Sequence, residues 1–140
     1  MSVRQLSVFL ENSPGRVAEV TKILAEAHID ISALVLSDTI DFGVLRLIVS
    51  DNDKAYQVLK ENSFIVRQSD VIIVPFSREA GSLAKVLEVL GNACIKIEYM
   101  YAFLGKESGE AFGVFKMEDL DEAKTVLEKN NIKRICESEL

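Results

Sequence analysis

The sequence predicts an α+β protein made of two copies of one β-α-β-β-α-β unit, residues 1–69 and 70–140. Short alternating or β-branched runs separate stretches in which apolar residues recur every three or four positions, so predicted strands and helices follow the same order twice. The second half also repeats the first at a shift of 66 positions: seven of the 22 residues in 14–35 are identical to their counterparts. A structural repeat is the simplest explanation.

In the first copy, an apolar stripe predicts a helix with its charged residues Glu19, Lys22 and Glu26 in solvent. Several residues in 50–53 are suitable N-caps for the second helix, which is expected to end near Asn62. The predicted elements are strands at 3–10, 29–36, 42–49 and 64–68, and helices at 14–27 and between 50 and 62.

The second copy repeats this order, with a hairpin that is four residues longer and a second helix region that is two residues shorter. Length changes that fall at loops are typical of a structural repeat. The predicted elements are strands at 71–76, 95–104, 112–117 and 132–136, and helices along the apolar stripes of 83–90 and 120–127.

The join between the copies is only Gln68-Ser69-Asp70, which is neither Gly-rich nor Pro-rich. Residues 71–74 and much of 97–104 are apolar on both faces, and a single-layer sheet would expose one of them. We therefore expect the second face to be buried by the other copy or by another chain, with the two copies packed as an intrachain pseudo-dimer. The basic residues Arg46 and Lys116, within apolar third strands, are expected at a sheet edge or on an open face.

Composition excludes several classes of function. The net charge is −6 and no basic patch is present, so a nucleic-acid partner is not expected. No apolar run approaches the ~18 residues of a membrane span. The N-terminal segment lacks a signal-peptide layout, which predicts a cytoplasmic location.

The sequence offers no catalytic constellation. His28 is the only histidine, and Cys94 and Cys136 form no C-x-x-C pair. No G-x-x-x-x-G-K or G-x-G-x-x-G motif occurs. We predict no catalytic residue, no metal site and no cofactor, and hence a protein that is not an enzyme. Cys94 aligns with His28 and is expected to be a buried or half-buried structural thiol.

The strand-to-helix turn Asn12-Ser13-Pro14-Gly15 is the most informative motif, and Ala80-Gly81 echoes it in the second copy. The β-α-β-β-α-β order is the ferredoxin-like arrangement. Residues 12–17, followed by His28-Ile29-Asp30-Ile31 after the helix, resemble the ACT domain family. That family has an Asp or Asn, one residue, Pro-Gly, an aliphatic residue two positions later, and a Gly-Ile-Asn-Ile-like stretch. The resemblance extends over nearly the whole chain as two tandem copies.

The resemblance implies a regulatory protein that binds a small molecule, most often an amino acid, and that pairs into homodimers or acts on a metabolic enzyme. It places the ligand between paired copies, near the first turn of one and the second strand of the other. The ligand-binding residues expected on this basis are Asn12, Ser13, Pro14, Gly15, Arg16, Val17, Asp30, Ile31, Arg78, Gly81 and Lys96.

The chemistry of the first turn agrees with this expectation. The free N–H groups at the start of a helix favour a carboxylate, and Asp30 is able to accept a hydrogen bond from an ammonium group. Two plainer explanations stay open: Asn12 and Ser13 serve as helix caps, and Asp30 is a solvated strand residue.

The second copy departs from the pattern, since Arg78 replaces Asn12 and Lys96 replaces Asp30. Pseudo-symmetric pairing would bring the Asn12 turn to Lys96 and the Arg78 turn to Asp30. An Arg78–Asp30 ion pair would close one of the two unlike sites and leave at most one good ligand site.

Two other functions are considered. A ferredoxin-like acylphosphatase needs an Arg in the first turn and an Asn on the hairpin; Arg16 and Arg78 lie in the right region, but the hairpin Asn is missing. A ligand-free ACT-type module that only dimerises or interacts with a partner is the principal alternative.

Overall fold

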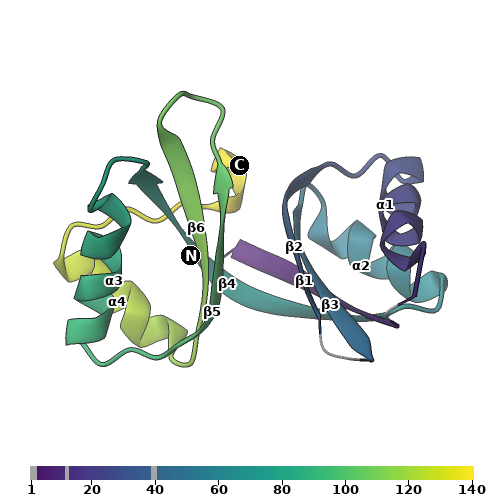
Figure 1. The fold of residues 1–140 in the computed structure, drawn as a ribbon, viewed down its shortest axis with the longest axis horizontal. Coiled ribbons are helices and arrows are strands. Elements are labelled where there is room, and N and C mark those ends of the chain that lie inside the picture. Colours follow the sequence, from purple (N-terminus) through teal and green to yellow (C-terminus); the bar gives the residue numbers. More distant parts are fainter. Residues whose placement is uncertain (1–2, 12, 39–40) are drawn as a thin grey trace. The chain divides into compact units, whose positions relative to one another are not determined.

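The computed structural model describes residues 3–11, 13–38 and 41–140 (Figure 1). The chain divides into two compact units, Arg4–Ser69 and Asp70–Leu140, with Val3 grouped with the second. The β-α-β-β-α-β order occurs twice along the chain, which confirms the predicted fold class.

The first unit is an antiparallel sheet with strand order β2-β3-β1-β4. Its two helices pack on the face formed by Leu6, Val8, Leu45 and Leu47. The elements are β1 (Val3–Glu11), α1 (Arg16–Glu26), β2 (Ile31–Asp38), β3 (Phe42–Val49), α2 (Asn52–Glu61) and the start of β4 (Ile65–Ser77).

The second unit has strand order β4-β6-β5. Its core joins Ile72 and Val74 of β4 to Phe115 of β6 and to the buried faces of α3 and α4. The elements are the remainder of β4, α3 (Ser82–Asn92), β5 (Ile97–Leu104), β6 (Glu110–Met117), α4 (Leu120–Lys129) and a short 3-10 helix, η1 (Glu137–Glu139).

Two strand predictions are wrong. The strands expected at 64–68 and 71–76 are one continuous strand, β4, because no residue between them breaks the extended backbone. The strand expected at 132–136 is reduced to a single bridge, in which Ile135 pairs with Ile73 and its N–H donates to the Ile73 carbonyl at 2.9 Å.

Each helix is followed by a residue with a left-handed backbone: His28, Ser63, Cys94 and Asn131 have φ between 56° and 68°. Such a residue ends a helix by turning the chain away from the helix axis. Cys94 is exposed in this turn, like the aligned His28. The prediction of a buried or half-buried thiol is therefore wrong.

The basic residues of the third strands do not lie at a sheet edge. β3 lies between β2 and β1, and β6 lies between β4 and β5, so the edge position is wrong, and the structure supports the alternative of an open sheet face. Both side chains are half-buried on the face opposite the helices, where Arg46 donates to Ser37 Oγ at 3.1 Å and Lys116 Nζ lies 3.7 Å from Glu98.

Among the residues that the structure describes, no helix is both long and apolar enough to cross a membrane.

The predicted extension of the second hairpin by four residues is wrong. Leu6 pairs with Leu47 and Ile72 with Phe115, so β6 follows β3 at a shift of 68 and the second hairpin is only two residues longer than the first.

Gly43 of β3 and Gly113 of β6 differ in the space around them. A Cβ added at Gly113 would lie 2.7 Å from a ring carbon of the fully buried Phe115, whereas one at Gly43 would lie 3.2 Å from the Cδ1 of the exposed Leu36. We expect Gly113→Ala to lower the free energy of unfolding by about 1–3 kcal/mol, because the ring has to move within a packed core. Gly43→Ala, whose neighbour is free to rotate, should cost much less. Urea denaturation of both variants checks this, and equal losses would contradict it.

Candidate functional site

The first turn is built around a left-handed glycine. Gly15 has φ 85° and is the N-cap of α1, and none of the side chains that the structure describes caps the helix. The helix therefore begins at Arg16, so the placement of Pro14 in the first helical turn is wrong, as is the capping role considered for Ser13. Ser13, Pro14 and Gly15 are exposed, and Ser13 N–H donates to Glu11 at 2.8 Å. Asn12 lies outside the described residues.

This turn presents backbone donors to solvent. The first hydrogen bond of the helical ladder runs from Glu19 N–H to the Gly15 carbonyl at 3.0 Å. The N–H groups of Val17 and Ala18 precede that ladder and receive no cap from a side chain within residues 3–11, 13–38 or 41–140. Together with the helix dipole, they can hold a carboxylate.

The side chain of Arg16 is engaged within its own unit. Its Nη1 atom lies 2.7 Å from Glu19 Oε2, and its guanidinium carbon lies 4.6 Å from the centroid of the Phe64 ring. Val17 is half-buried against the core of the unit. Arg16 and Val17 thus fix the start of α1, while the backbone beside them offers the donors.

The second turn has the same backbone and different contacts. Gly81 has φ 88° and precedes α3, which also lacks a side-chain cap. Ser82 Oγ accepts a hydrogen bond from Ser77 N–H, and Ser77 Oγ accepts one from Glu79 N–H, both at 3.0 Å. Arg78 N–H donates to the Gly109 carbonyl at 3.0 Å. A hollow here is lined by Ser77, Arg78, Glu79, Ser108 and Gly109.

The remaining predicted ligand residues lie beyond the far ends of the helices. Asp30 is exposed, its backbone exchanges hydrogen bonds with Ser50 at 3.0 and 2.9 Å, and Ile31 begins β2. Lys96 is exposed, and its carbonyl accepts from Glu118 N–H at 3.2 Å. Since α1 has 11 residues, its ends lie about 16 Å apart. A single unit therefore does not bring its turn to its own Asp30 or Lys96, and the cross-copy pairings stay predictions.

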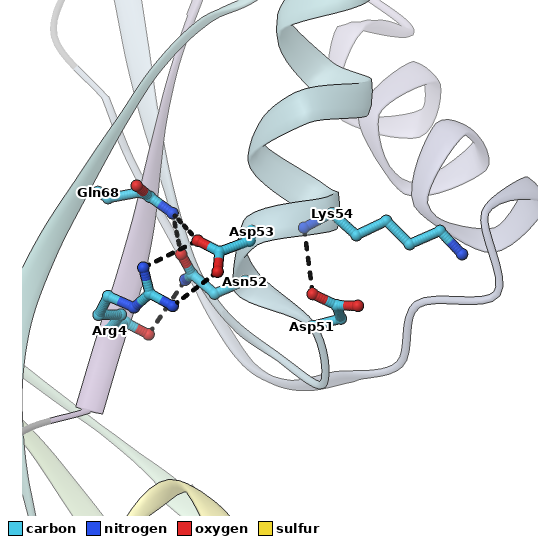
Figure 2. Close-up of polar contacts among 6 residues, drawn as sticks. All are labelled: Arg4, Asp51, Asn52, Asp53, Lys54 and Gln68. Carbon is cyan, nitrogen blue, oxygen red and sulfur yellow. Dashed lines mark hydrogen bonds and ion pairs between the residues drawn. The ribbon is translucent and has the colours of Figure 1, made fainter.

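A polar network that sequence reasoning missed joins β1, α2 and β4 within the first unit (Figure 2). Arg4 binds Asp53 with two hydrogen bonds of 2.8 and 3.1 Å. The buried Asn52 donates to the Arg4 carbonyl at 3.2 Å and accepts from Gln68 at 2.5 Å. At the start of α2, Asp51 accepts from the backbone N–H of Lys54, which confirms an N-cap within 50–53.

The network changes the acidity of one carboxyl group. The pKa of Asp53 is held below its ordinary value. The hydrogen bonds from Arg4 are the largest cause, and the hydrogen bond from Gln68 is the second largest. Asp70 and Asp121 of the second copy align with Arg4 and Asp53, so the ion pair has no equivalent there.

These second-copy residues line a separate hollow that is rich in acids: Asp70, Cys94, Ile95, Lys96, Glu118, Asp119, Leu120, Asp121, Glu122 and Lys124. Over the part of the chain that the structure covers, no group of three or more His, Cys, Asp or Glu side chains is placed to hold a metal ion. Neither the network nor this hollow assembles a nucleophile, a base and a substrate-binding cleft.

A family model described as an ACT domain pair matches residues 1–140. This chain belongs to the ACT domain family. The finding confirms the resemblance that was based on residues 12–17 and 28–31 and on the repeated topology. No curated protein matches the chain.

Solved structures extend the comparison for this ACT domain pair. The crystal structure of protein BT0572 from Bacteroides thetaiotaomicron is 42% identical, with a TM-score of 0.92 over 99% of this chain and 94% of that one. The regulatory subunit of aspartate kinase from Thermus thermophilus, in its ligand-free form, gives a TM-score of 0.66 at 14% identity over 90% of both chains. The regulatory subunit of aspartate kinase from Thermus flavus gives a TM-score of 0.65 at 16% identity, over 89% of this chain and 88% of that one. Because the identity to the two aspartate kinase subunits is low, these two comparisons show a similar fold and no more.

The Arg4–Asp53 pair makes the first unit sensitive to acid. A carboxyl group whose pKa is lowered by folding stabilises the fold above its unfolded pKa of about 4, and this contribution is lost as the pH falls through the folded value. We expect Asp53→Asn to be less stable than the wild type at pH 7 and to approach it below about pH 3. Thermal unfolding across this range measures the effect, with Asp121→Asn as the matched control. A constant difference at all pH values would refute the assignment.

Proposed function

We propose that this ACT domain pair is a regulatory protein that binds a small molecule, most simply an amino acid, at the turn before α1. The observation that carries the proposal is the exposed left-handed Gly15, which is followed by N–H groups of Val17 and Ala18 that no described side chain caps. The family match supports it, and so does the likeness in fold to a protein named as a regulatory subunit of aspartate kinase. A role in the regulation of amino-acid metabolism follows from the same reasoning.

An amino acid suits the chemistry of this turn. Its carboxylate would accept hydrogen bonds from the N–H groups at the start of α1, where the helix dipole favours an anion. Asn12 would add a group that both donates and accepts. A further polar contact would come from the other copy, which would bring Lys96 to the first turn. Ser13, Pro14 and Arg16 would take supporting positions there. Asp30, Ile31, Arg78 and Gly81 would belong to the second turn, where an Arg78–Asp30 ion pair would leave no good ligand site.

The proposal also covers the location and the partners of the protein. The protein would act in the cytoplasm as a homodimer or on a metabolic enzyme as a separate regulatory chain, without catalysis of its own. A pairing module that binds no ligand is the second candidate. The edge strand β2 favours it, because Leu34 and Leu36 are about half exposed there, at 51% and 48%.

Ligand-induced thermal stabilisation separates the two candidates. An amino acid present at a hundredfold its dissociation constant should raise the free energy of unfolding by about 2.7 kcal/mol, because it binds only the folded protein. A thermal-shift screen with the twenty common amino acids, each as the free L-isomer, measures this. The absence of a shift with all of them would favour the pairing module.

The two turn glycines provide a matched pair of variants. Gly15 and Gly81 have nearly the same φ, 85° and 88°, and a Cβ added at either meets no atom within 4 Å. Gly15→Ala and Gly81→Ala should therefore cost similar stability, about 1–2 kcal/mol each, through backbone strain. We expect only Gly15→Ala to weaken binding of the stabilising amino acid, in calorimetric titrations.

Asn12→Ala should likewise reduce the affinity without unfolding the protein. Equal loss of binding in both glycine variants, or unchanged affinity in Asn12→Ala, would contradict the assignment of the site to the first turn.

A further inference from the structure

The first unit holds two basic side chains around the start of α2. Arg4 of β1 donates two hydrogen bonds to the carboxylate of Asp53, at 2.8 and 3.1 Å (Figure 2). Lys54 donates from Nζ to the carbonyl of Ala27, at the end of α1, at 2.7 Å. A guanidinium group and an ammonium group are therefore bound at this place in the fold, and the unit supplies both from its own side chains.

The second unit has acids in place of both cations. β4 pairs with β6 as β1 pairs with β3, at a shift of 66 residues in the first strand and 68 in the second, so Asp70 takes the place of Arg4. α2 and α4 both begin after an aspartate N-cap, and the third residue of the helix is Lys54 in α2 and Glu122 in α4. The second residue is an aspartate in both helices. The acceptor of the guanidinium group is thus kept, while both basic residues are replaced by acids.

These acids line the hollow of the second unit, which has a volume of about 670 Å³. That size lies within the range of small-molecule sites. Five carboxylate and two lysine side chains line the hollow, among them Asp70, Asp121 and Glu122, so its net charge is negative. Among the residues that the structure describes, none forms an ion pair with these three acids. The hollow therefore presents unpaired negative charge where the first unit has its own cations.

The dipole of α4 explains only part of this acidity. Asp119 is the N-cap of the helix, and Asp121 and Glu122 lie in its first turn, where the dipole favours an acid. Asp70 belongs to β4 and Glu118 precedes the N-cap, so this explanation does not extend to them. Over the residues that the structure covers, no group of three or more His, Cys, Asp or Glu side chains is placed to hold a metal ion. An organic cation therefore suits the hollow better than a metal ion does.

We propose that the hollow of the second unit binds a small organic cation that carries a guanidinium group, with Asp121 as its main acceptor and Asp70 and Glu122 beside it. The observation that carries this proposal comes from the first unit, where Asp53, the counterpart of Asp121, binds a guanidinium group through both carboxylate oxygens. Such paired, charge-assisted hydrogen bonds are the strongest that a carboxylate forms with this group. The site belongs to the second unit and does not depend on the amino-acid site proposed at the first turn.

Agmatine is the probe that tests this site, because it has a guanidinium group and lacks the carboxylate that the first turn would bind. Calorimetric titration of the full chain at low ionic strength, where exposed charges are screened least, should give one agmatine per chain. N-carbamoylputrescine, in which an uncharged urea group replaces the guanidinium, should bind at least about tenfold more weakly, because it loses the charge-assisted hydrogen bonds. Absence of agmatine binding, or equal affinity for the two compounds, would overturn the proposal.

Three variants locate the site. Asp121→Asn should weaken agmatine binding at least about tenfold, whereas Glu88→Gln, the same loss of charge at an exposed position of α3 outside the hollow, should leave it unchanged. Asp70→Arg restores the residue of the first unit, so it should abolish agmatine binding without lowering the midpoint of thermal unfolding. Unchanged affinity in Asp121→Asn or Asp70→Arg, or an equal loss in Glu88→Gln, would overturn the assignment. Gly15→Ala should still bind agmatine, which separates this site from the proposed amino-acid site.

Discussion

The arrangement at both candidate turns depends on one backbone constraint, a glycine with positive φ between a strand and a helix. Gly15 and Gly81 adopt φ values of 85° and 88°, which cost a residue with a Cβ about 1–2 kcal/mol. This conformation turns the chain from the sheet directly into the first residue of the helix. Among the described residues, no side chain caps either helix, so the first N–H groups stay available to another partner. A polar side chain in the capping position would satisfy these donors internally.

Because the backbone is the same in both copies, the difference between them lies in the groups around the turn. In the first copy, Arg16 is held by Glu19 and Phe64, away from the exposed glycine backbone. In the second copy, Ser82 and Gly109 accept hydrogen bonds from the N–H groups of the turn itself. The two copies therefore keep the same turn backbone and surround it with different contacts.

The sequence predicted the fold because apolar periodicity reports local geometry, and the repeat doubled each signal. It could not predict that β4 is continuous, since Gln68-Ser69-Asp70 is polar like a turn but is compatible with an extended backbone. It missed the network of Arg4, Asn52, Asp53 and Gln68 because these side chains meet only when distant segments pair. The error at Cys94 has a different origin: its alignment with His28 suggested a structural thiol, but both residues lie in an exposed left-handed turn at a helix end.

The length of the helices limits how a ligand site can be assembled. A turn and the residue that follows the same helix, Asp30 or Lys96, are separated by about 16 Å, more than twice the length of an amino acid's polar backbone. In the proposed site these groups must come from different copies, so the exchange of Asp30 for Lys96 changes the charge opposite the other copy's turn. A lysine beside the open first turn would add a second cationic donor for a carboxylate. An aspartate beside the second turn would face the cationic side chain of Arg78, which makes that turn a poorer place for a free ligand.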